Sequence, residues 1–182
     1  MLEDIEIYTV GLGNRRVDQL IGILQDYGIR VVIDARIEFE SSSGAPASRD
    51  TLRQALEEEE IEYNWVGRQL GGNRMAKPGS INTALKDDLR GFADYMTSQD
   101  FLIGLRQLSG FAGKRPAAML FTAKLPDKCH RCLIADALMM RGMSVIHILD
   151  ETKSRQHALS PTLRRESTEL VYDMAIPSKN VH

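Results

Sequence analysis

The stretch I-R-V-V-I-D-A, residues 29–35, has the composition of a β-strand that is buried on both faces. Its apolar residues follow one another without alternation, which is typical of a parallel sheet covered by helices on both sides. A helical pattern precedes it in V-D-Q-L-I-G-I-L-Q-D-Y-G, residues 17–28, and ends at Gly28, where a helix C-cap belongs. This helix–strand pair predicts an α/β fold.

The rest of the chain continues the alternation of strand and helix patterns. Further strands are predicted at 5–10, 61–66, 116–123 and 144–149, and further helices at 48–60, 89–96, 100–108 and 129–141. Ser48 and Ser98 have the positions of helix N-caps. Loops are predicted at 38–47 and 67–80. We expect one α/β domain over residues 1–161, with a mostly parallel central sheet of about five strands and helices on both faces. Residues 162–182 form a tail with a short helix at 163–172.

The composition is that of a globular protein and excludes several classes. The chain has 182 residues, of which 43% are hydrophobic and 26% charged, and a net charge of −2. A protein that coats nucleic acid needs a general basic excess, so any nucleic-acid contact would use a local patch. No apolar run approaches the roughly 20 residues of a membrane span. The acidic N-terminus is unlike a signal peptide, and the two cysteines cannot form a stapling framework. We therefore expect a cytoplasmic protein with free thiols.

The loops that follow the strands predict a ligand site, because ligands of parallel sheets bind at the carboxyl ends of the strands. Basic side chains dominate these loops, with Asp34 as the main opposing carboxylate. The cluster Cys129-His130-Arg131-Cys132 opens the helix after the fourth strand, where a helix N-terminus favours anions. A small ligand carrying a phosphate or carboxylate would suit this edge; the alternative is that the cations are ordinary solvated or salt-bridged residues. The cations are Arg15, Arg36, Arg68, Arg74, Lys124 and Arg131.

Other chemistries have weaker support. Cys129 and Cys132 form a C-x-x-C pair, but redox proteins with this motif carry it after an early strand. As zinc ligands, Cys129 and Cys132 supply two of the four ligands that a closed structural site needs. No second pair of ligands has suitable spacing in the sequence. His147 alternates with Val145 and is expected to be a core histidine. The segment that begins at Gly11 lacks the third glycine of a dinucleotide fingerprint, since Arg16 stands there. No cofactor or metal is expected.

Several segments together resemble the family of domain of unknown function 488. They are Y-T-V-G-L-G-N-R (8–15), V-V-I-D-A-R (31–36), L-G-G (70–72), L-R-G-F-A-D-Y-M (89–96), D-K-C-H-R-C-L-I-A-D-A-L (127–138) and H-A-L-S-P (157–161). The resemblance covers residues 5–161 and implies a compact α/β domain whose polar signature residues share one site. Carried onto this chain, those residues are Asn14, Arg15, Asp34, Arg36, Gly71, Gly72, Tyr95, Cys129, His130, Arg131 and His157.

The chain departs from the family pattern in two places. The family usually has G-H-S-N-R where this chain has G-L-G-N-R, and C-A-E where this chain has Thr122-Ala123-Lys124. The second change replaces an acid by a cation, which favours binding an anion over deprotonating a substrate. Catalysis would then fall to Cys129, His130 and Asp34. The alternative is a binding or regulatory module that has lost catalysis; a homodimer is left open.

Overall fold

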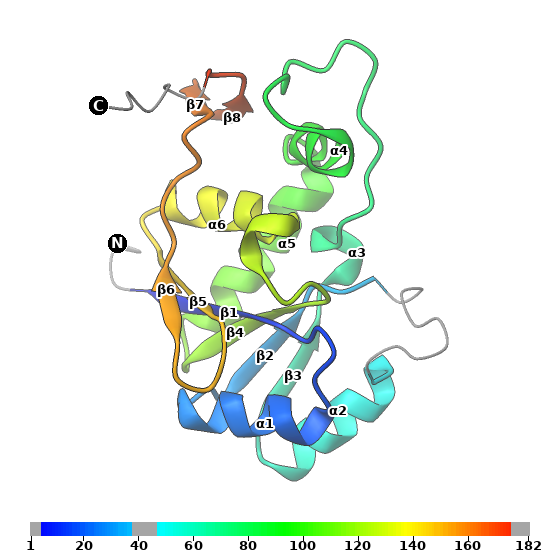
Figure 1. Ribbon diagram of the computed structural model, residues 1–182, viewed down its shortest axis with the longest axis vertical. Coiled ribbons are helices and arrows are strands. Elements are labelled where there is room, and N and C mark those ends of the chain that lie inside the picture. Colours follow the sequence, from blue (N-terminus) through cyan, green and yellow to red (C-terminus); the bar gives the residue numbers. More distant parts are fainter. Residues whose placement is uncertain (1–4, 38–46, 176–182) are drawn as a thin grey trace, which may run out of the picture.

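The structure, a computed structural model, describes residues 5–37 and 47–175 (Figure 1). Nearly all of the loop predicted at 38–47 lies outside the described residues. Six strands form the central sheet, in the order β3-β2-β4-β1-β5-β6, and only the pairing of β5 with β6 is antiparallel. The predicted fold class is confirmed. The strands are β1 (Glu6–Gly11), β2 (Val31–Asp34), β3 (Glu62–Trp65), β4 (Ala117–Phe121), β5 (Ser144–Ile148) and β6 (Ser154–Gln156).

Helices cover both faces of the sheet, and the described residues form six of them. α1 (Val17–Asp26) and α2 (Arg49–Glu58) lie on one face, and the other face carries α3 (Gly67–Leu70), α4 (Asp87–Tyr95), α5 (Gln99–Ala112) and α6 (Arg131–Met139) (Figure 1). The two predicted N-caps are confirmed. The Ser48 hydroxyl accepts a hydrogen bond from the Thr51 amide, and the Ser98 hydroxyl accepts one from the Phe101 amide, both at 3.2 Å.

The strands are buried on both sides because their side chains alternate between two hydrophobic cores. In β2, Val31 and Ile33 pack toward α4, α5 and α6, whereas Val32 packs toward α1 and α2. In β4, Met119 packs toward α4, α5 and α6, whereas Leu120 packs toward α1 and α2. Each of the five residues of β4 is at most 2% exposed. This double burial is the physical reason for the continuous apolar runs in the sequence.

The order of the strands places a crevice at the carboxyl end of β4. The connections after β1 and β2 run through α1 and α2 on one face, and the connection after β4 runs through α6 on the other (Figure 1). β4 lies between β1 and β2 in the sheet. Since neighbouring chains diverge to opposite faces there, the end of β4 is a topological switch point, the usual ligand position in such sheets.

Three predicted elements differ in the structure. The helix expected at 163–172 is wrong: this segment is an antiparallel hairpin of β7 (Leu163–Glu166) and β8 (Glu169–Tyr172). Ser167 has a φ of 57°, which turns the chain, and Tyr172 is fully buried against the domain. The loop expected at 67–80 begins with the short helix α3. The helix expected at 129–141 starts at Arg131, after a 3-10 turn at Pro126–Lys128.

None of the helices within the described ranges has the length and apolar character that crossing a bilayer requires.

We predict that Ser167→Gly stabilises the protein, because glycine adopts the positive φ of this turn without steric cost. The gain should be about 1 kcal/mol in the free energy of unfolding, measured by urea denaturation. In a helix the same change would cost about 0.5 kcal/mol, so the sign separates the hairpin from the helix. Thr168→Gly is the matched control, since Thr168 is not among the residues with positive φ, and it should destabilise.

Candidate functional site

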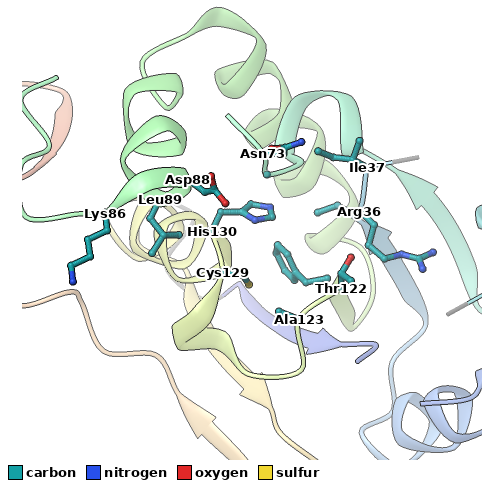
Figure 2. A pocket seen from close by; sticks show the side chains of 13 residues that line it. Arg36, Ile37, Asn73, Lys86, Asp88, Leu89, Thr122, Ala123, Cys129 and His130 are labelled. Atoms are coloured by element: carbon teal, nitrogen blue, oxygen red, sulfur yellow. The ribbon is translucent and has the colours of Figure 1, made fainter. Parts of the chain in front are cut away.

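A pocket of about 520 Å³ opens at the carboxyl end of β4, at the switch point of the sheet (Figure 2). Its walls come from five separate parts of the chain: the segment after β2, the end of β4, the segment after α3, the start of α4, and the residues just before α6. The lining residues are Ala35, Arg36, Ile37, Gly72, Asn73, Lys86, Asp88, Leu89, Phe121, Thr122, Ala123, Cys129 and His130. Four of the predicted site residues therefore meet here: Arg36, Gly72, Cys129 and His130.

Arg36 is held in the pocket wall by the buried carboxylate of Asp34. The Arg36 Nε and Nη2 atoms donate to Asp34 at 2.8–3.2 Å, and the Tyr63 hydroxyl donates to the same carboxylate at 2.7 Å. Burial works against the charge of Arg36, but the Asp34 carboxylate outweighs it and raises the pKa of Arg36. Asp34 is 1% exposed and does not line the pocket, so its role is to position Arg36.

His130 presents a neutral ring to the pocket. Its ring centroid lies 4.7 Å from that of Phe92 and 5.4 Å from that of Phe121, and its Nε2 lies 3.0 Å from the Leu70 carbonyl oxygen. Because a carbonyl can only accept, Nε2 carries the proton and Nδ1 is an acceptor. Burial lowers the pKa of His130 to about 4. A Cβ atom on Gly72 would lie 2.7 Å from Nδ1, so only glycine fits beside this ring.

Cys129 lines the pocket, whereas Arg131 lies behind it. The Arg131 side chain is fully buried, and its Nη2 donates to the carbonyl oxygens of Ala123 at 2.8 Å and Lys124 at 3.0 Å. Arg131 therefore fixes the loop after β4 to the start of α6. The Cys132 thiol donates to the Cys129 carbonyl oxygen at 3.1 Å, and burial raises the pKa of Cys132 to about 12. Both cysteines are free.

Five other predicted residues lie outside the pocket lining. Arg15 donates to the carbonyl oxygens of Gly11 and Leu149, and so braces the loop after β1. Asn14 and Lys124 are exposed. Gly71 and Tyr95 support the pocket from behind: a Cβ on Gly71 would lie 2.3 Å from the Gly67 oxygen, and the Tyr95 hydroxyl donates to the Gln69 carbonyl at 2.9 Å.

His157 lies outside the pocket lining and belongs to a second polar cluster, around Asp136 of α6. The Asp136 carboxylate lies 2.8 Å from His157 Nε2 and accepts from the Tyr172 hydroxyl at 3.0 Å. His157 Nδ1 lies 2.9 Å from His147 Nε2, and His147 Nδ1 lies 2.6 Å from the Thr9 hydroxyl. His157 and Asp136 line a cavity of about 370 Å³. The prediction that His147 is a satisfied core histidine is confirmed, since it is 1% exposed and bonded at both nitrogens.

Several residues of the pocket lining were not predicted from the sequence. Lys86, Asp88 and Leu89 reach the pocket because α4 begins beside it. Nothing in the local pattern of Lys86 and Asp88 indicates a site, whereas Leu89 opens the segment L-R-G-F-A-D-Y-M that contributes to the family resemblance. Asn73 has a φ of 58°, and its place next to the L-G-G motif is a signal that could have pointed to it. Among the described residues, no three side chains of His, Cys, Asp or Glu converge where they could hold a metal ion.

We predict that stability falls as the pH drops below 6.5, and that His130 accounts for part of the loss. The pKa of His130 is about 4 in the folded protein, against an ordinary value of 6.5. Between these two pH values, His130 therefore binds a proton in the unfolded chain but not in the folded chain. The contribution is complete above about pH 6.5 and decreases toward about pH 4, by on the order of 3 kcal/mol. Urea unfolding of wild type and His130→Gln at both ends of this range measures it. Equal pH slopes in the two proteins would contradict the assignment.

Comparisons with known proteins point to one family. The family described as "Domain of unknown function DUF488" matches residues 16–138, which is more than half of the chain. The match includes Asp34, Arg36, Gly71, Gly72, Tyr95 and the Cys129–Arg131 segment, and it stops before His157. Comparison with curated proteins and with solved structures found no significant match.

Proposed function

The chain belongs to the DUF488 family, whose function is not known, and from the geometry of the pocket we propose that it binds a small ligand carrying a phosphate or carboxylate group. The observation that carries the proposal is the position of the pocket: it lies at the switch point beside β4, and Arg36 and Lys86 line it. Open parallel sheets bind their ligands at this point irrespective of the reaction.

The size and walls of the pocket suit a ligand with a planar ring. A volume of about 520 Å³ is within the usual range for small-molecule sites. The rings of Phe121 and His130 both line it, and aromatic faces stack with flat rings. A nucleotide or another component of a nucleic acid is the ligand class that combines a flat ring with a phosphate.

The charged and hydrogen-bonding side chains of the lining make different parts of the pocket suitable for different groups of a ligand. Arg36 and Lys86 are cations, opposed within the lining by the exposed carboxylate of Asp88. His130 Nδ1 is an acceptor that calls for a donor on the ligand, such as an amino or hydroxyl group. Figure 2 shows Arg36 and Lys86 on opposite sides of His130, so we orient an anionic group toward one or the other of these cations and a neutral donor toward His130.

Chemistry at this site, if the protein is an enzyme, would fall to Cys129 as the nucleophile. His130 is neutral and hydrogen-bonded through Nε2, which suits it to orient a substrate and not to supply a proton at neutral pH. Asp34 accepts the hydrogen bonds of Arg36 and so positions it, and we assign it no chemical step. We place the activity in the cytoplasm, because the two cysteines are free thiols and a reducing compartment keeps them so.

A module that binds without reacting is the second candidate, and one observation favours it. The end of β4 lines the pocket with Phe121, Thr122 and Ala123, which supply neither a carboxylate nor a thiol. Turnover that disappears in Cys129→Ser, with ligand binding retained, would reject this candidate.

We predict that ligands of the proposed class raise the melting temperature through the pocket cations. The probes are nucleoside monophosphates, sugar phosphates and dicarboxylates, screened by thermal shift, with the affinity of each hit measured by calorimetry. Lys86→Ala should weaken an anionic hit by about tenfold, since one exposed charge-assisted contact contributes about 1.4 kcal/mol.

Lys124→Ala is the matched control, because Lys124 is an exposed lysine at the same edge but outside the pocket lining. It should leave the affinity unchanged. If the two variants weaken binding equally, the effect is a general surface potential and the pocket assignment is wrong. If no probe of the panel binds, the proposed ligand class is wrong.

A further inference from the structure

Two adjoining cavities lie against α5 (Gln99–Ala112), and neither shares a lining residue with the pocket. The larger has a volume of about 510 Å³. The smaller has a volume of about 190 Å³ and is lined in part by Glu169 and Leu170 of the β7–β8 hairpin. Leu102 of α5 and Arg141, which follows α6, line both cavities, so we treat the two as one groove, the α5 groove. α5 and α6 lie on the same face of the sheet (Figure 1). The larger cavity is lined by Gln99, Leu102, Leu105, Arg106, Ser109 and Arg141.

The larger cavity has two arginines and no acidic residue in its lining. Arg106 and Arg141 line it together with one amide, one hydroxyl and two leucines. An arginine keeps its positive charge in proteins. Neither guanidinium forms an ion pair with an Asp or Glu of the described ranges. Because the whole chain has a net charge of −2, this excess of positive charge is local. The larger cavity therefore favours an anion.

Arg141 is held over the last turn of α6 by a hydrogen bond to its own helix. Its Nη1 donates to the Ala137 carbonyl oxygen at 2.9 Å. Partial burial lowers the pKa of Arg141, because the guanidinium loses contacts with water. An arginine has five N–H donors, and those of Arg141 that are not directed at Ala137 have no partner among the described residues. A carboxylate in the groove would replace the lost water contacts by charge-assisted hydrogen bonds.

The smaller cavity suits an apolar side chain. Met96, Phe101 and Leu170 line it, and all three pack in or against the hydrophobic core, which fixes the walls. The exposed carboxylate of Glu169 also lines this cavity and would repel a second acid there. An apolar part of a ligand is therefore directed to the smaller cavity, and its acidic parts are directed to the larger one.

The α5 groove has the length of a short peptide. Gln99 and Ser109 line the larger cavity at its two extremes along α5, and the helical rise of about 1.5 Å per residue places them about 15 Å apart. An extended peptide advances about 3.3 Å per residue. About five residues of an extended peptide would therefore cover the groove.

We propose that the α5 groove binds an acidic peptide segment of a partner protein. One apolar side chain of the peptide enters the smaller cavity, and two carboxylates pair with Arg106 and Arg141. Arginine clusters recognise acidic motifs in this way, because a guanidinium binds a carboxylate through two parallel hydrogen bonds. A peptide suits the groove better than a small molecule does, since its separate side chains reach separate cavities. Binding here is independent of the ligand of the pocket, because the pocket and the groove have no lining residue in common.

The test is the fluorescence anisotropy of short dye-labelled peptides added to the full chain. Each peptide carries one leucine or phenylalanine and two aspartates, in both orders and at several spacings, between glycines and serines. We predict that peptides of this set bind, and that changing both aspartates of a binding peptide to asparagine weakens it about a hundredfold, or about tenfold for each charge-assisted contact. Changing its leucine or phenylalanine to glycine should weaken it by at least about tenfold.

Arg106→Gln and Arg141→Gln should each weaken a binding peptide about tenfold, because each removes one cation from the groove. Arg106 has no hydrogen-bond partner among the described residues, so its replacement leaves the fold intact. Arg165→Gln is the matched control. Arg165 is an exposed arginine on β7, outside the lining of both cavities, and its Nε donates to the Ser167 carbonyl oxygen. This variant should leave the affinity unchanged.

Four results would overturn the assignment. One is that no peptide of the set binds with a Kd below about 1 mM. Another is an equal loss of affinity in all three arginine variants, which would indicate a general surface potential. If succinate displaces a bound peptide at the concentration at which the unlabelled peptide does so, the groove is a site for small anions. If the protein sediments as a dimer or larger species and Arg106→Gln makes it monomeric, a second copy of the chain covers the groove.

Discussion

The hydrogen bonds from Arg131 to the carbonyl oxygens of Ala123 and Lys124 are the contact on which the pocket depends. They join the end of β4 to the start of α6, two segments that would otherwise separate where the chain leaves the sheet. The Cys129–His130 pair lies between them and is held against the pocket. A backbone turn fixed by a buried guanidinium is rigid, because moving it would expose the charge or strand two carbonyl groups.

The fold could be predicted from the sequence where the burial of an element produces a recognisable pattern of hydrophobic residues. Continuous apolar runs such as 29–35 exist because two cores share each strand, and the serine caps mark helix starts through a local bond. The hairpin at 163–172 was missed because its stability comes from a distant contact. The Tyr172 amide donates to the Asn82 side chain at 3.0 Å, ninety residues earlier in the chain, and local propensity contains no trace of that bond.

The candidate site was predicted in outline and not in detail, for a related reason. Strand order determines which loops converge, so the alternation of elements was enough to bring Arg36, Cys129 and His130 to one edge. It could not tell which side chains face the pocket and which brace it. Arg15 and Arg131 were expected as anion binders, yet both spend their donors on backbone oxygens. Local packing over a few ångströms decides whether a guanidinium contacts solvent or carbonyl groups. The spacing of residues in the sequence does not reveal this packing.

The edges of the sheet have a consequence for self-association. At one end, β6 is three residues long, exposed and polar, with the sequence Ser154-Arg155-Gln156. At the other end, β3 carries Glu62, which pairs with Arg115. Short, charged outer strands discourage a second molecule from adding its own strand. If two copies of this protein associate, a continuous central sheet running across both molecules is therefore disfavoured.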